Sequence, residues 1–323
     1  MTHPFTKAML SRRSFVKTAA MGVGALQIPN LFTACTVSTK KADMPDPAPT
    51  LKISLAQWSL HRAIEQGVVS AADFAGIAIN EYGFDAVEYV SGFYKENARD
   101  EKFWNTLRAS SDQYGVTNLL IMIDDEGDLG SLGKERKAAV ENHFKWIDAA
   151  KILGCHSVRV NAFGEGDKVS VQAAMIDSMG ELCAYAEKEN IHVLIENHGL
   201  YSADGRWVAG IMEAVGRPNC GTLPDFGNWC TNAKWGSTQG DQCSESYDPY
   251  QGVAEMLPYA KGVSAKSYHF GAEGMETKID YARMLQLVKA SGFAGHIGIE
   301  YEGAVLSEPD GIRATQALLQ RLW

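Results

Sequence analysis

Basic side chains are scarce in this chain of 323 residues, and their scarcity argues against one class of partner. There are 30 Lys and Arg against 39 Asp and Glu, for a formal net charge of −9. A phosphate backbone repels charge of this sign, and no basic groove is visible in the sequence. The balance disfavours nucleic acid as a partner and fits small neutral substrates or metal cations.

Glycine-rich phosphate-binding motifs and long apolar runs are also missing. No GxxxxGK[ST] sequence occurs, and AQWSLHRA follows the first predicted strand, where a dinucleotide fingerprint would stand. The N-terminal run TAAMGVGALQIPNLF is broken by Gln27, Pro29 and Asn30, and it is too short for a comfortable membrane span. These absences disfavour P-loop and dinucleotide-binding proteins, and the N-terminal run is not expected to span a membrane.

The first 35 residues read as an export address. SRRSFVK at residues 11–17 resembles a bacterial twin-arginine (Tat) signal, which predicts the Tat machinery as a partner and a periplasmic or exported location. FTAC, ending at Cys35, resembles a lipobox with Phe in place of the usual Leu, so membrane anchoring through a lipid on Cys35 stays open. Residues 36–50 are rich in Pro, Lys and Asp and predict a linker. The remainder carries −13, because the first 35 residues hold four basic and no acidic side chains.

Cysteines are few, and five follow the signal: Cys155, Cys183, Cys220, Cys230 and Cys243. This is an odd number for a protein of an oxidising compartment. Cys230 and Cys243 share one polar loop, so these two could pair. The simpler interpretation is that most of the five are small buried hydrophobic residues.

What the chain does have is globular composition, with 46% hydrophobic and 10% aromatic residues, and a regular alternation of short and long segments from residue 51 onward. Short runs rich in β-branched residues predict strands. The eight candidates are Ile53–Gln57, Ala86–Tyr89, Val116–Ile123, Ser157–Asn161, Val193–Glu196, Gly221–Pro224, Gly262–Lys266 and His296–Glu300.

Segments of helical period separate these strands, with Gly83, Gly216 and Gly292 among the predicted stop signals. The predicted helices follow Ser70 and lie near Glu101–Tyr114, Lys134–Leu153, Val169–Glu189, Arg206–Val215, Tyr250–Ala260, Asp280–Ser291 and Glu308–Leu322. Eight strand–helix units in about 270 residues match an α/β fold of the (β/α)8 TIM-barrel type, as a single domain over residues 51–323. A doubly wound open sheet is the competitor, and the missing dinucleotide fingerprint disfavours it.

Polar and aromatic side chains gather at the carboxyl ends of the predicted strands, where the active sites of such barrels lie. They are Gln57, Trp58, His61, Glu88, Asp124, Glu126, Arg159, Asn161, Glu196, Asn197, His198, Asp225, Asn228, Lys266, Tyr268, His269, Glu300 and Glu302. A lone carboxylate among them is most simply a residue facing water. Glu196, Asp225 and Glu300 differ, because each directly follows an apolar run that predicts a buried strand. Grouped and desolvated carboxylates repel one another, so these three predict a divalent cation among them.

Four of these strand ends carry a specific resemblance. VLIENHG, TLPDFGNW, GVSAKSYHF and GIEYEG, in this order, resemble the xylose isomerase-like barrel superfamily of sugar isomerases and epimerases. The resemblance covers residues 51–323 and implies a metal, Mn²⁺, Mg²⁺, Co²⁺ or Zn²⁺, held by Glu, Asp, His and Glu of the fifth to eighth strands. Glu196, Asp225 and Glu300 match three of these ligands by position.

The fourth ligand position departs from the family pattern. Where the family often has His-x-Lys, this chain has Ser264 followed by Ala265 and Lys266. A serine hydroxyl is a poor ligand for Zn²⁺ and suits a hard cation with water completing its shell. The expected substitutes are water first, then His269 as a metal ligand folding back over the site. The third is Lys266, on the same strand face as Ser264, supplying positive charge without a metal.

The resemblance implies proton transfer at a carbon next to a carbonyl of a sugar. The metal would bind the carbonyl and the neighbouring hydroxyl and stabilise the enediolate. Glu196 and Glu300 would remove and return the proton, with His198 and Lys266 as candidates for an uncoordinated acid or base. Return to the same carbon gives epimerisation, and return to its neighbour gives isomerisation.

Substrate contacts are expected from hydrogen-bonding and aromatic residues near the same strand ends. They are Trp58, Glu88, Arg159, Asn161, Asn228 and Trp229. The two tryptophans present faces on which sugar rings stack, although they would equally serve as rim packing, as His198 would. The long loop from Asn228 to Tyr250 is expected to overhang the site as a lid.

Other functions stay open on this sequence. With no phosphate cradle, a free sugar or glycoside is favoured over a sugar phosphate. A lyase or hydrolase of keto-glycosides would begin with the same proton removal and then expel the group on the adjacent carbon. A sugar-binding barrel without metal or catalysis is the third reading. A homo-oligomer is compatible with the sequence, which does not determine the oligomeric state.

Overall fold

The structure is a computed structural model that describes residues 50–240 and 242–323. The predicted Tat signal, the lipobox at Cys35 and the linker up to residue 49 lie outside the described residues. Within the described part, no helix has both the length and the apolar character needed to cross a membrane.

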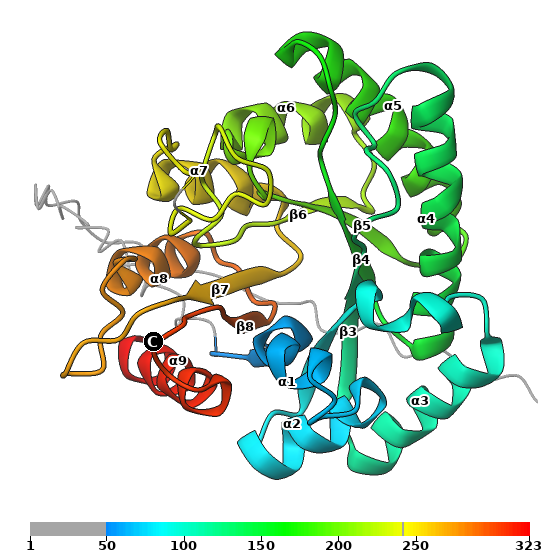
Figure 1. Cartoon of the computed structure of the whole chain (residues 1–323). Helices are drawn as coiled ribbons and strands as arrows, with labels where there is room; N and C mark the ends of the chain where they lie inside the picture. Colours follow the sequence, from blue (N-terminus) through cyan, green and yellow to red (C-terminus); the bar gives the residue numbers. More distant parts are fainter. Residues whose placement is uncertain (1–49, 241) are drawn as a thin grey trace, which may run out of the picture. The chain divides into compact units, whose positions relative to one another are not determined.

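Eight parallel strands form one curled sheet, as the sequence predicted (Figure 1). They are β1 (Ile53–Ala56), β2 (Ala86–Val90), β3 (Thr117–Met122), β4 (Ser157–Asn161), β5 (His192–Glu196), β6 (Cys220–Leu223), β7 (Val263–Ser267) and β8 (Ile297–Tyr301). Neighbours follow the order β6-β5-β4-β3-β2-β1-β8-β7, so β8 lies between the first strand and the seventh. Every strand pairing in this sheet is parallel.

The two end strands of this order, β6 and β7, are joined just beyond β6. The amide of Ser264 donates to Pro224 O at 2.9 Å, and the amide of Phe226 donates to Ser264 O at 3.1 Å. Between these bonds, Asp225 pairs with Ser264 as an isolated parallel bridge. The sheet therefore closes on itself, and the predicted (β/α)8 barrel is confirmed.

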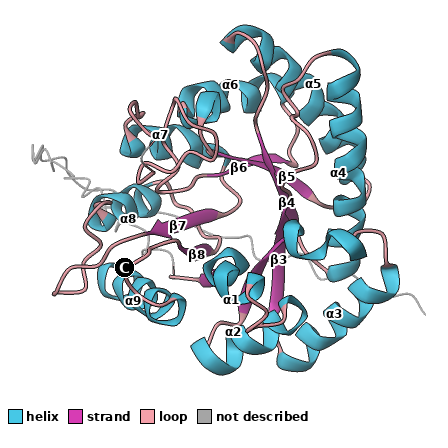
Figure 2. Ribbon diagram, viewed as in Figure 1, coloured by secondary structure: helices cyan, strands magenta, loops and turns pink. Residues whose placement is uncertain are grey.

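Helices connect the strands and cover the outer face of the sheet (Figure 2). The longer ones are α2 (Phe74–Tyr82), α3 (Glu101–Tyr114), α4 (Gly133–Leu153), α5 (Lys168–Glu187), α6 (Gly205–Val215), α7 (Pro249–Met256), α8 (Tyr281–Ala290) and α9 (Glu308–Leu322), and α1 (His61–Glu65) is a short turn. Asp carboxylates cap the first turns of α3, α5, α6, α7 and α8. Gly83 and Gly216, two of the predicted stop signals, end α2 and α6 with positive φ.

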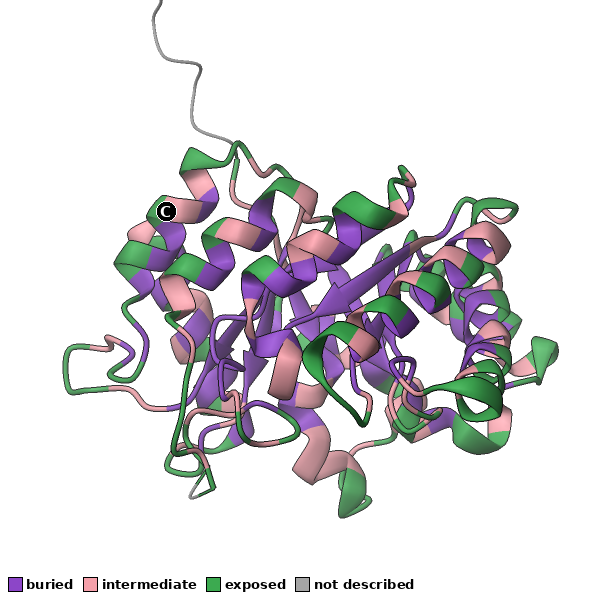
Figure 3. Cartoon of the chain, turned by 90° about the horizontal axis from the view of Figure 1, so that it is seen from above, coloured by how far each residue is buried: buried purple, intermediate pink, exposed green. Residues whose placement is uncertain are grey.

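Burial follows from this arrangement. The strands are buried over almost their whole length, while each of the longer helices turns one buried face inward and an exposed face outward (Figure 3). The main apolar core includes Trp104 and Trp146, both almost fully buried. A second, separate cluster contains Ala56, Val90, Leu120, Met122, Leu194 and Leu223, with Trp58 packed against it. Each of these six residues belongs to a strand or ends one, so this cluster lies at the sheet itself.

Candidate functional site

Three carboxylates from separate strands meet in one buried cluster. Glu196 is the last residue of β5, Asp225 lies two residues after β6, and Glu300 is in β8. One oxygen of each lies within 4.8 Å of the others. All three side chains are almost fully buried. The structure therefore brings together the three carboxylates that the sequence singled out.

Ser264 lies between two of these carboxylates. Its Oγ is 2.6 Å from Asp225 Oδ2 and 2.8 Å from Glu300 Oε2. A hydroxyl has one proton, so it can donate to only one carboxylate at a time. The second contact is favourable when that carboxyl is protonated or when a cation draws both oxygens together. Burial raises the pKa of Asp225 to about 7, so a proton is readily held there.

Lys266 supplies positive charge on the same strand. Its Nζ is 2.9 Å from Glu302 Oε1, 3.1 Å from Glu300 Oε1 and 3.9 Å from Asp225 Oδ2. Burial opposes the charge, but Glu300 and the other two carboxylates raise the pKa of Lys266 well above its ordinary value. A protonated amine cannot accept a proton, so this geometry favours Lys266 as a counter-charge over Lys266 as a base.

Glu196 is held from two sides. Asn228 Nδ2 donates to Oε1 at 3.3 Å, and Arg159 Nε lies 2.7 Å from Oε2. The Arg159 contact is an ion pair without hydrogen-bond alignment, so Oε2 is buried with no aligned donor. Burial raises the pKa of Glu196 well above its ordinary value despite this arginine. A buried carboxylate oxygen in this state is one that a cation would satisfy.

The donor set of this cluster fits a hard divalent cation. It offers three carboxylates and the Ser264 hydroxyl, and oxygen ligands of this kind suit Mg²⁺ or Mn²⁺ better than Zn²⁺. Charge balance points the same way. Two basic side chains face five carboxyl groups here, so a cation would reduce the excess of acidic groups. Arg159 and Lys266 are the basic residues, and the carboxyls belong to Asp124, Glu196, Asp225, Glu300 and Glu302.

His198 belongs to a hydrogen-bonded chain beside Glu196. Its Nδ1 is 2.6 Å from Asn161 Oδ1, and Asn161 Nδ2 donates to Asp124 Oδ1 at 2.7 Å. Because that amide group must donate to the carboxylate, Asn161 Oδ1 is the acceptor, and Nδ1 of His198 carries its hydrogen. Burial lowers the pKa of His198 well below its ordinary value, with Arg159 adding to the effect. The imidazole is therefore neutral near pH 7, with its lone pair on Nε2.

A cavity of about 370 Å³ adjoins the cluster. Its lining residues are Trp58, Val90, Gly92, Met122, Asp124, Asp125, Arg159, His198, Trp235, Ser237, Glu300 and Glu302. Its size is at the lower end of small-molecule sites. Of the substrate-binding residues predicted from sequence, Trp58 and Arg159 line it directly, and Asn161 bonds to His198 behind its wall.

Trp229, predicted to contact substrate, is a structural residue instead. Its side chain is fully buried and stacks with Tyr247 at 6.4 Å between ring centroids. Gly252 of α7 packs so closely on the indole that an added Cβ would lie 2.0 Å from it. Trp229 therefore fixes α7 and does not line the cavity.

Two further predicted residues lie outside the cavity wall. Glu88 is buried in β2, where it accepts a hydrogen bond from Ser54 Oγ at 2.6 Å. Asn228 is buried and holds Glu196, so it reaches the site through that carboxylate. Neither lines the cavity, so their predicted direct contact with substrate is not what this structure shows.

His269, predicted as a metal ligand, is not part of the carboxylate group. Its backbone amide donates to Glu276 Oε1 at 2.9 Å, and its carbonyl accepts from the amide of Thr277. Phe270, the next residue, pairs with Glu276 as an antiparallel bridge. These bonds hold the segment in its own turn after β7, which explains why His269 does not fold back toward Ser264.

The loop between β6 and α7 contributes residues that sequence reasoning missed. Trp235 and Ser237 both line the cavity. The Trp235 ring lies 5.2 Å from His198 and 5.3 Å from Phe163, edge to face in both cases. Its backbone has a φ of 69°, which costs energy for a bulky residue. A sequence signal for this turn was the neighbouring Gly236, since glycine favours tight turns.

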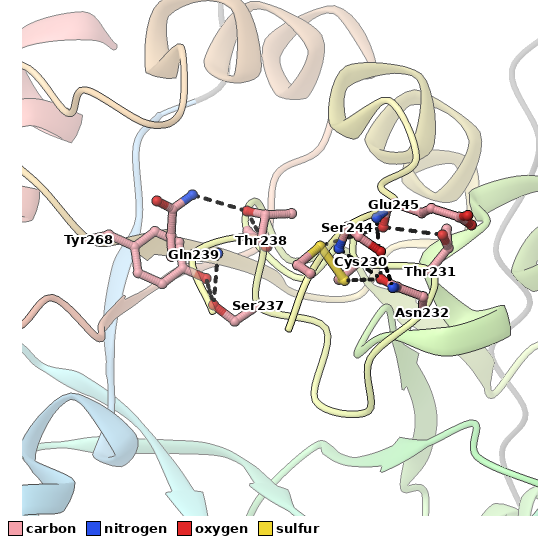
Figure 4. The surroundings of a disulfide bond; sticks show 11 residues. Cys230, Thr231, Asn232, Ser237, Thr238, Gln239, Ser244, Glu245 and Tyr268 are labelled. Atoms are coloured by element: carbon pink, nitrogen blue, oxygen red, sulfur yellow. Dashed lines mark hydrogen bonds between the residues drawn. A yellow bond between two sulfur atoms is a disulfide. The ribbon is translucent and has the colours of Figure 1, made fainter. Parts of the chain in front are cut away.

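A disulfide between Cys230 and Cys243 spans this loop (Figure 4). Asn232 and Ser244 bond to each other beside it, and Ser237 lies next to Tyr268 at the other end of the loop. Lys234 pairs with Gly199 as a backbone bridge and forms an ion pair with Asp128 at 3.3 Å. Cys155, Cys183 and Cys220 are free and buried, as the simpler interpretation had them. The loop expected to act as a lid is thus fastened at several points.

Comparison with solved structures agrees with the barrel. D-psicose 3-epimerase from Clostridium cellulolyticum H10 superimposes with a TM-score of 0.62 at 14% identity, over 84% of this chain and 98% of that one. The 3-keto-D-glucoside 4-epimerase from E. coli gives 0.62 at 13% identity, over 84% and 100%. A xylose isomerase-like protein from Mycobacterium smegmatis in complex with magnesium gives 0.61 at 16% identity, over 84% and 97%. At these identities the likeness establishes the fold.

The sequence itself was compared in two further ways. No curated protein matches it significantly. A family model described as the xylose isomerase-like TIM barrel matches residues 77–322, which is well over half of the chain. This match covers β2 to β8 and all four strand ends whose motifs carried the resemblance. The chain belongs to the xylose isomerase-like TIM barrel family.

Proposed function

We propose that the protein catalyses proton transfer at a carbon next to a carbonyl group of a sugar or sugar derivative, and so epimerises or isomerises it. The observation that carries this proposal is the cluster of Glu196, Asp225 and Glu300, three buried carboxylates from separate strands. Two of the similar structures are named as sugar epimerases, which supports the same class of reaction.

The surroundings of Glu196 and Glu300 fit two proton-transfer groups. Ser264 and Lys266 hold separate oxygens of Glu300, which also lines the cavity. Arg159 and Asn228 hold separate oxygens of Glu196. Two carboxylates fixed independently can take a proton at one face of a substrate carbon and return one at the other. His198, with Nε2 as an acceptor, would orient a substrate hydroxyl.

A divalent cation held by Glu196, Asp225 and Glu300 would polarise the carbonyl oxygen of the substrate. Lys266 would remain paired with Glu302 and limit the repulsion among the remaining carboxylates. The all-oxygen donor set favours Mg²⁺ or Mn²⁺ in this role, and one of the similar structures is described in complex with magnesium.

Exchange of solvent deuterium into a substrate carbon tests this proposal, because epimerisation, isomerisation and elimination all begin with proton removal. The substrates are D-fructose, D-psicose and a 3-keto-glucoside, and the readout is mass spectrometry with NMR assignment of the labelled carbon. Glu196→Gln and Glu300→Gln are each expected to lower the exchange rate by about 10²- to 10⁴-fold.

Glu88→Gln is the matched control, since Glu88 is equally buried in the same barrel but lies outside the cluster and the cavity lining. It should retain exchange within a few-fold of the parent. If Glu196→Gln and Glu300→Gln also retained it, neither carboxylate would take part in proton transfer.

A further inference from the structure

The cavity beside the carboxylate cluster has two chemically different walls. One wall consists of Trp58, Val90, Gly92 and Met122, which we call the apolar arc. These residues stand at the ends of three consecutive strands, with Val90 ending β2 and Met122 ending β3. Val90 and Met122 are direct neighbours in the register of β2 and β3. The apolar arc is therefore a continuous surface.

The apolar arc continues into the interior of the molecule. Val90 and Met122 belong to the second apolar cluster, and Trp58 packs against it. The Trp58 ring stacks with His61 at 4.5 Å and with Phe93 at 6.0 Å between ring centroids. These two contacts fix the position of the indole by packing. The side chains of Val90 and Met122 have no N–H or O–H with which to bond a ligand.

The other wall is polar. It contains Asp124, Arg159, His198, Ser237, Glu300 and Glu302, and it adjoins the carboxylate cluster. A monosaccharide carries hydroxyl groups around its whole ring. Placed in this cavity, it would bond well on the polar side and leave hydroxyls without partners against the apolar arc. Each such loss of a hydrogen bond in a desolvated place costs binding energy. A ligand that matches both walls has one polar side and one apolar side.

We propose that the substrate is an oxidised (keto) glycoside with an apolar aglycone, aryl or alkyl, whose aglycone lies on the apolar arc while its keto sugar faces the carboxylate cluster. This proposal rests on the proposed function and narrows its substrate class. Trp235, on the loop after β6, lines the cavity next to His198, where it would contact the sugar.

Equilibrium binding of unoxidised glucosides tests the assignment by isothermal titration calorimetry. Phenyl and methyl D-glucopyranosides, each as both anomers, differ only in the aglycone and carry no carbonyl, so they cannot be turned over during the measurement. The parent protein is expected to bind the better phenyl glucoside at least tenfold more tightly than its methyl counterpart, because burial of the phenyl ring adds apolar contact.

Two variants place polar atoms in the apolar arc at nearly constant volume. Met122→Gln and Val90→Thr should each reduce the preference for phenyl to threefold or less and leave methyl glucoside affinity within about twofold. Val90→Thr is isosteric, so it remains informative if Met122→Gln fails to fold, which circular dichroism would reveal. Tyr114→Ala is the control, since this half-exposed aromatic residue lies at the end of α3, outside the cavity.

Equal affinity of the parent for phenyl and methyl glucosides would overturn the aglycone assignment, as would an unchanged preference in both arc variants. Absence of binding by all of these glucosides would overturn it as well. None of these results touches the proton transfer, which depends on Glu196 and Glu300 and is judged by deuterium exchange. If the parent protein showed no deuterium exchange but kept its preference for the phenyl glucoside, the proposed function would be overturned instead.

Discussion

At the scale of single residues, Ser264 is the substitution that defines this site. Its hydroxyl lies within hydrogen-bond distance of Asp225 and Glu300, so a small neutral group stands between two acidic ones. A hydroxyl can both donate and accept a hydrogen bond, so Ser264 is compatible with a protonated cluster and with a cation-bound one. With a proton on one carboxyl it bridges the pair, and with a cation it turns its lone pairs inward.

Ser264→Ala should lower the free energy of unfolding by about 1–3 kcal/mol in the absence of divalent ions, because two buried carboxyls lose their bridging donor. Urea denaturation measures this change. Ser54→Ala is the matched control, since Ser54 donates to the buried Glu88 in the same way. Both variants should be destabilised, but only Ser264→Ala should alter the affinity for Mg²⁺. Equal Mg²⁺ affinity in the parent and both variants would show that Ser264 takes no part in metal binding.

Glu88 makes stability depend on pH. Burial raises its pKa from 4.5 to about 7, so the folded protein holds this proton more tightly than the unfolded chain does. The stabilisation is complete below about pH 4.5 and is lost as the pH rises through 7, with a total of about 3 kcal/mol. Glu88→Gln mimics the protonated form and should match the parent at pH 4.5. By pH 8.5 it should be more stable by about that amount.

Urea unfolding of the parent and Glu88→Gln at both pH values measures the difference. Glu126→Gln serves for comparison, because Glu126 is paired with Lys145 at 2.7 Å. A stability gap between the parent and Glu88→Gln that is the same at pH 4.5 and pH 8.5 would contradict a raised pKa at this position.

Two tryptophans show what sequence could and could not assign among single residues. Trp229 adjoins a strand-end motif, so the pattern favoured it as a sugar contact, yet α7 packs over it through Gly252. Trp235 lies six residues further into an irregular loop, and its place in the cavity depends on a turn with positive φ. Strand alternation predicts which way a strand residue points, but it has no equivalent for loops. The same reason underlies the misplaced His269.

At the scale of elements, strands and helices were predicted closely because each combines an apolar period with a turn signal. Ser157–Asn161, Glu101–Tyr114 and Glu308–Leu322 agree to the residue. The remaining strand ends differ by no more than one position, as at β8, which begins at Ile297 rather than at His296. Such shifts depend on backbone pairing with a neighbouring strand, which a single sequence does not display.

The loop after β6 is the element that most constrains the cavity. Its disulfide joins residues 13 positions apart, and a closed loop of this length stabilises the folded state by about 3 kcal/mol in the chain-entropy model. The same loop carries Trp235 and Ser237 into the cavity wall. Loss of the disulfide should therefore weaken ligand binding as well as the fold.

Cys230→Ser with Cys243→Ser should lower the midpoint of thermal unfolding and reduce the affinity for the preferred glucoside severalfold. Dithiothreitol should have the same effect on the parent and none on the double variant. Cys155, Cys183 and Cys220 are buried, which leaves this pair as the redox-sensitive one within the described residues. A parent whose melting and binding both ignore the reductant would show that other contacts, such as that of Lys234 with Asp128, are enough to hold the loop.

At the scale of the whole molecule, acidic residues outnumber basic ones, and three of them form the buried carboxylate cluster in the barrel. A cation that binds only the folded state adds stability of about 2.7 kcal/mol when its concentration is 100 times its dissociation constant. Mg²⁺ or Mn²⁺ at saturation should therefore raise the melting temperature of the parent by several degrees, measured by differential scanning calorimetry.

Glu196→Gln should abolish this shift, while Glu126→Gln, a carboxylate bonded to Lys145 and Trp146 away from the cluster, should preserve it. A parent that gains no stability from any divalent ion would favour a barrel that binds sugars without metal, with Lys266 as the permanent cation.

The fold as a whole was the most predictable property of the chain. Eight strand–helix repeats without a dinucleotide fingerprint favoured a closed barrel, and the carboxyl ends of parallel strands then share one face. This is why Glu196, Asp225 and Glu300 could be grouped in advance although more than 100 residues separate the first from the last. The sequence could not show which neighbouring residues line the cavity, because this depends on how the loops pack around that face.

The ring of strands is completed at Asp225 and Ser264, the same two residues that carry part of the cluster. The same two residues therefore close the barrel and form part of the site, so a substitution at either position affects both the fold and the site. Inactive variants at positions 225 and 264 are ambiguous unless their folding is measured alongside. Glu196 and Glu300 belong to β5 and β8, each of which is paired with a strand on both sides. Substitutions at these two positions should therefore affect the reaction with the least effect on the fold.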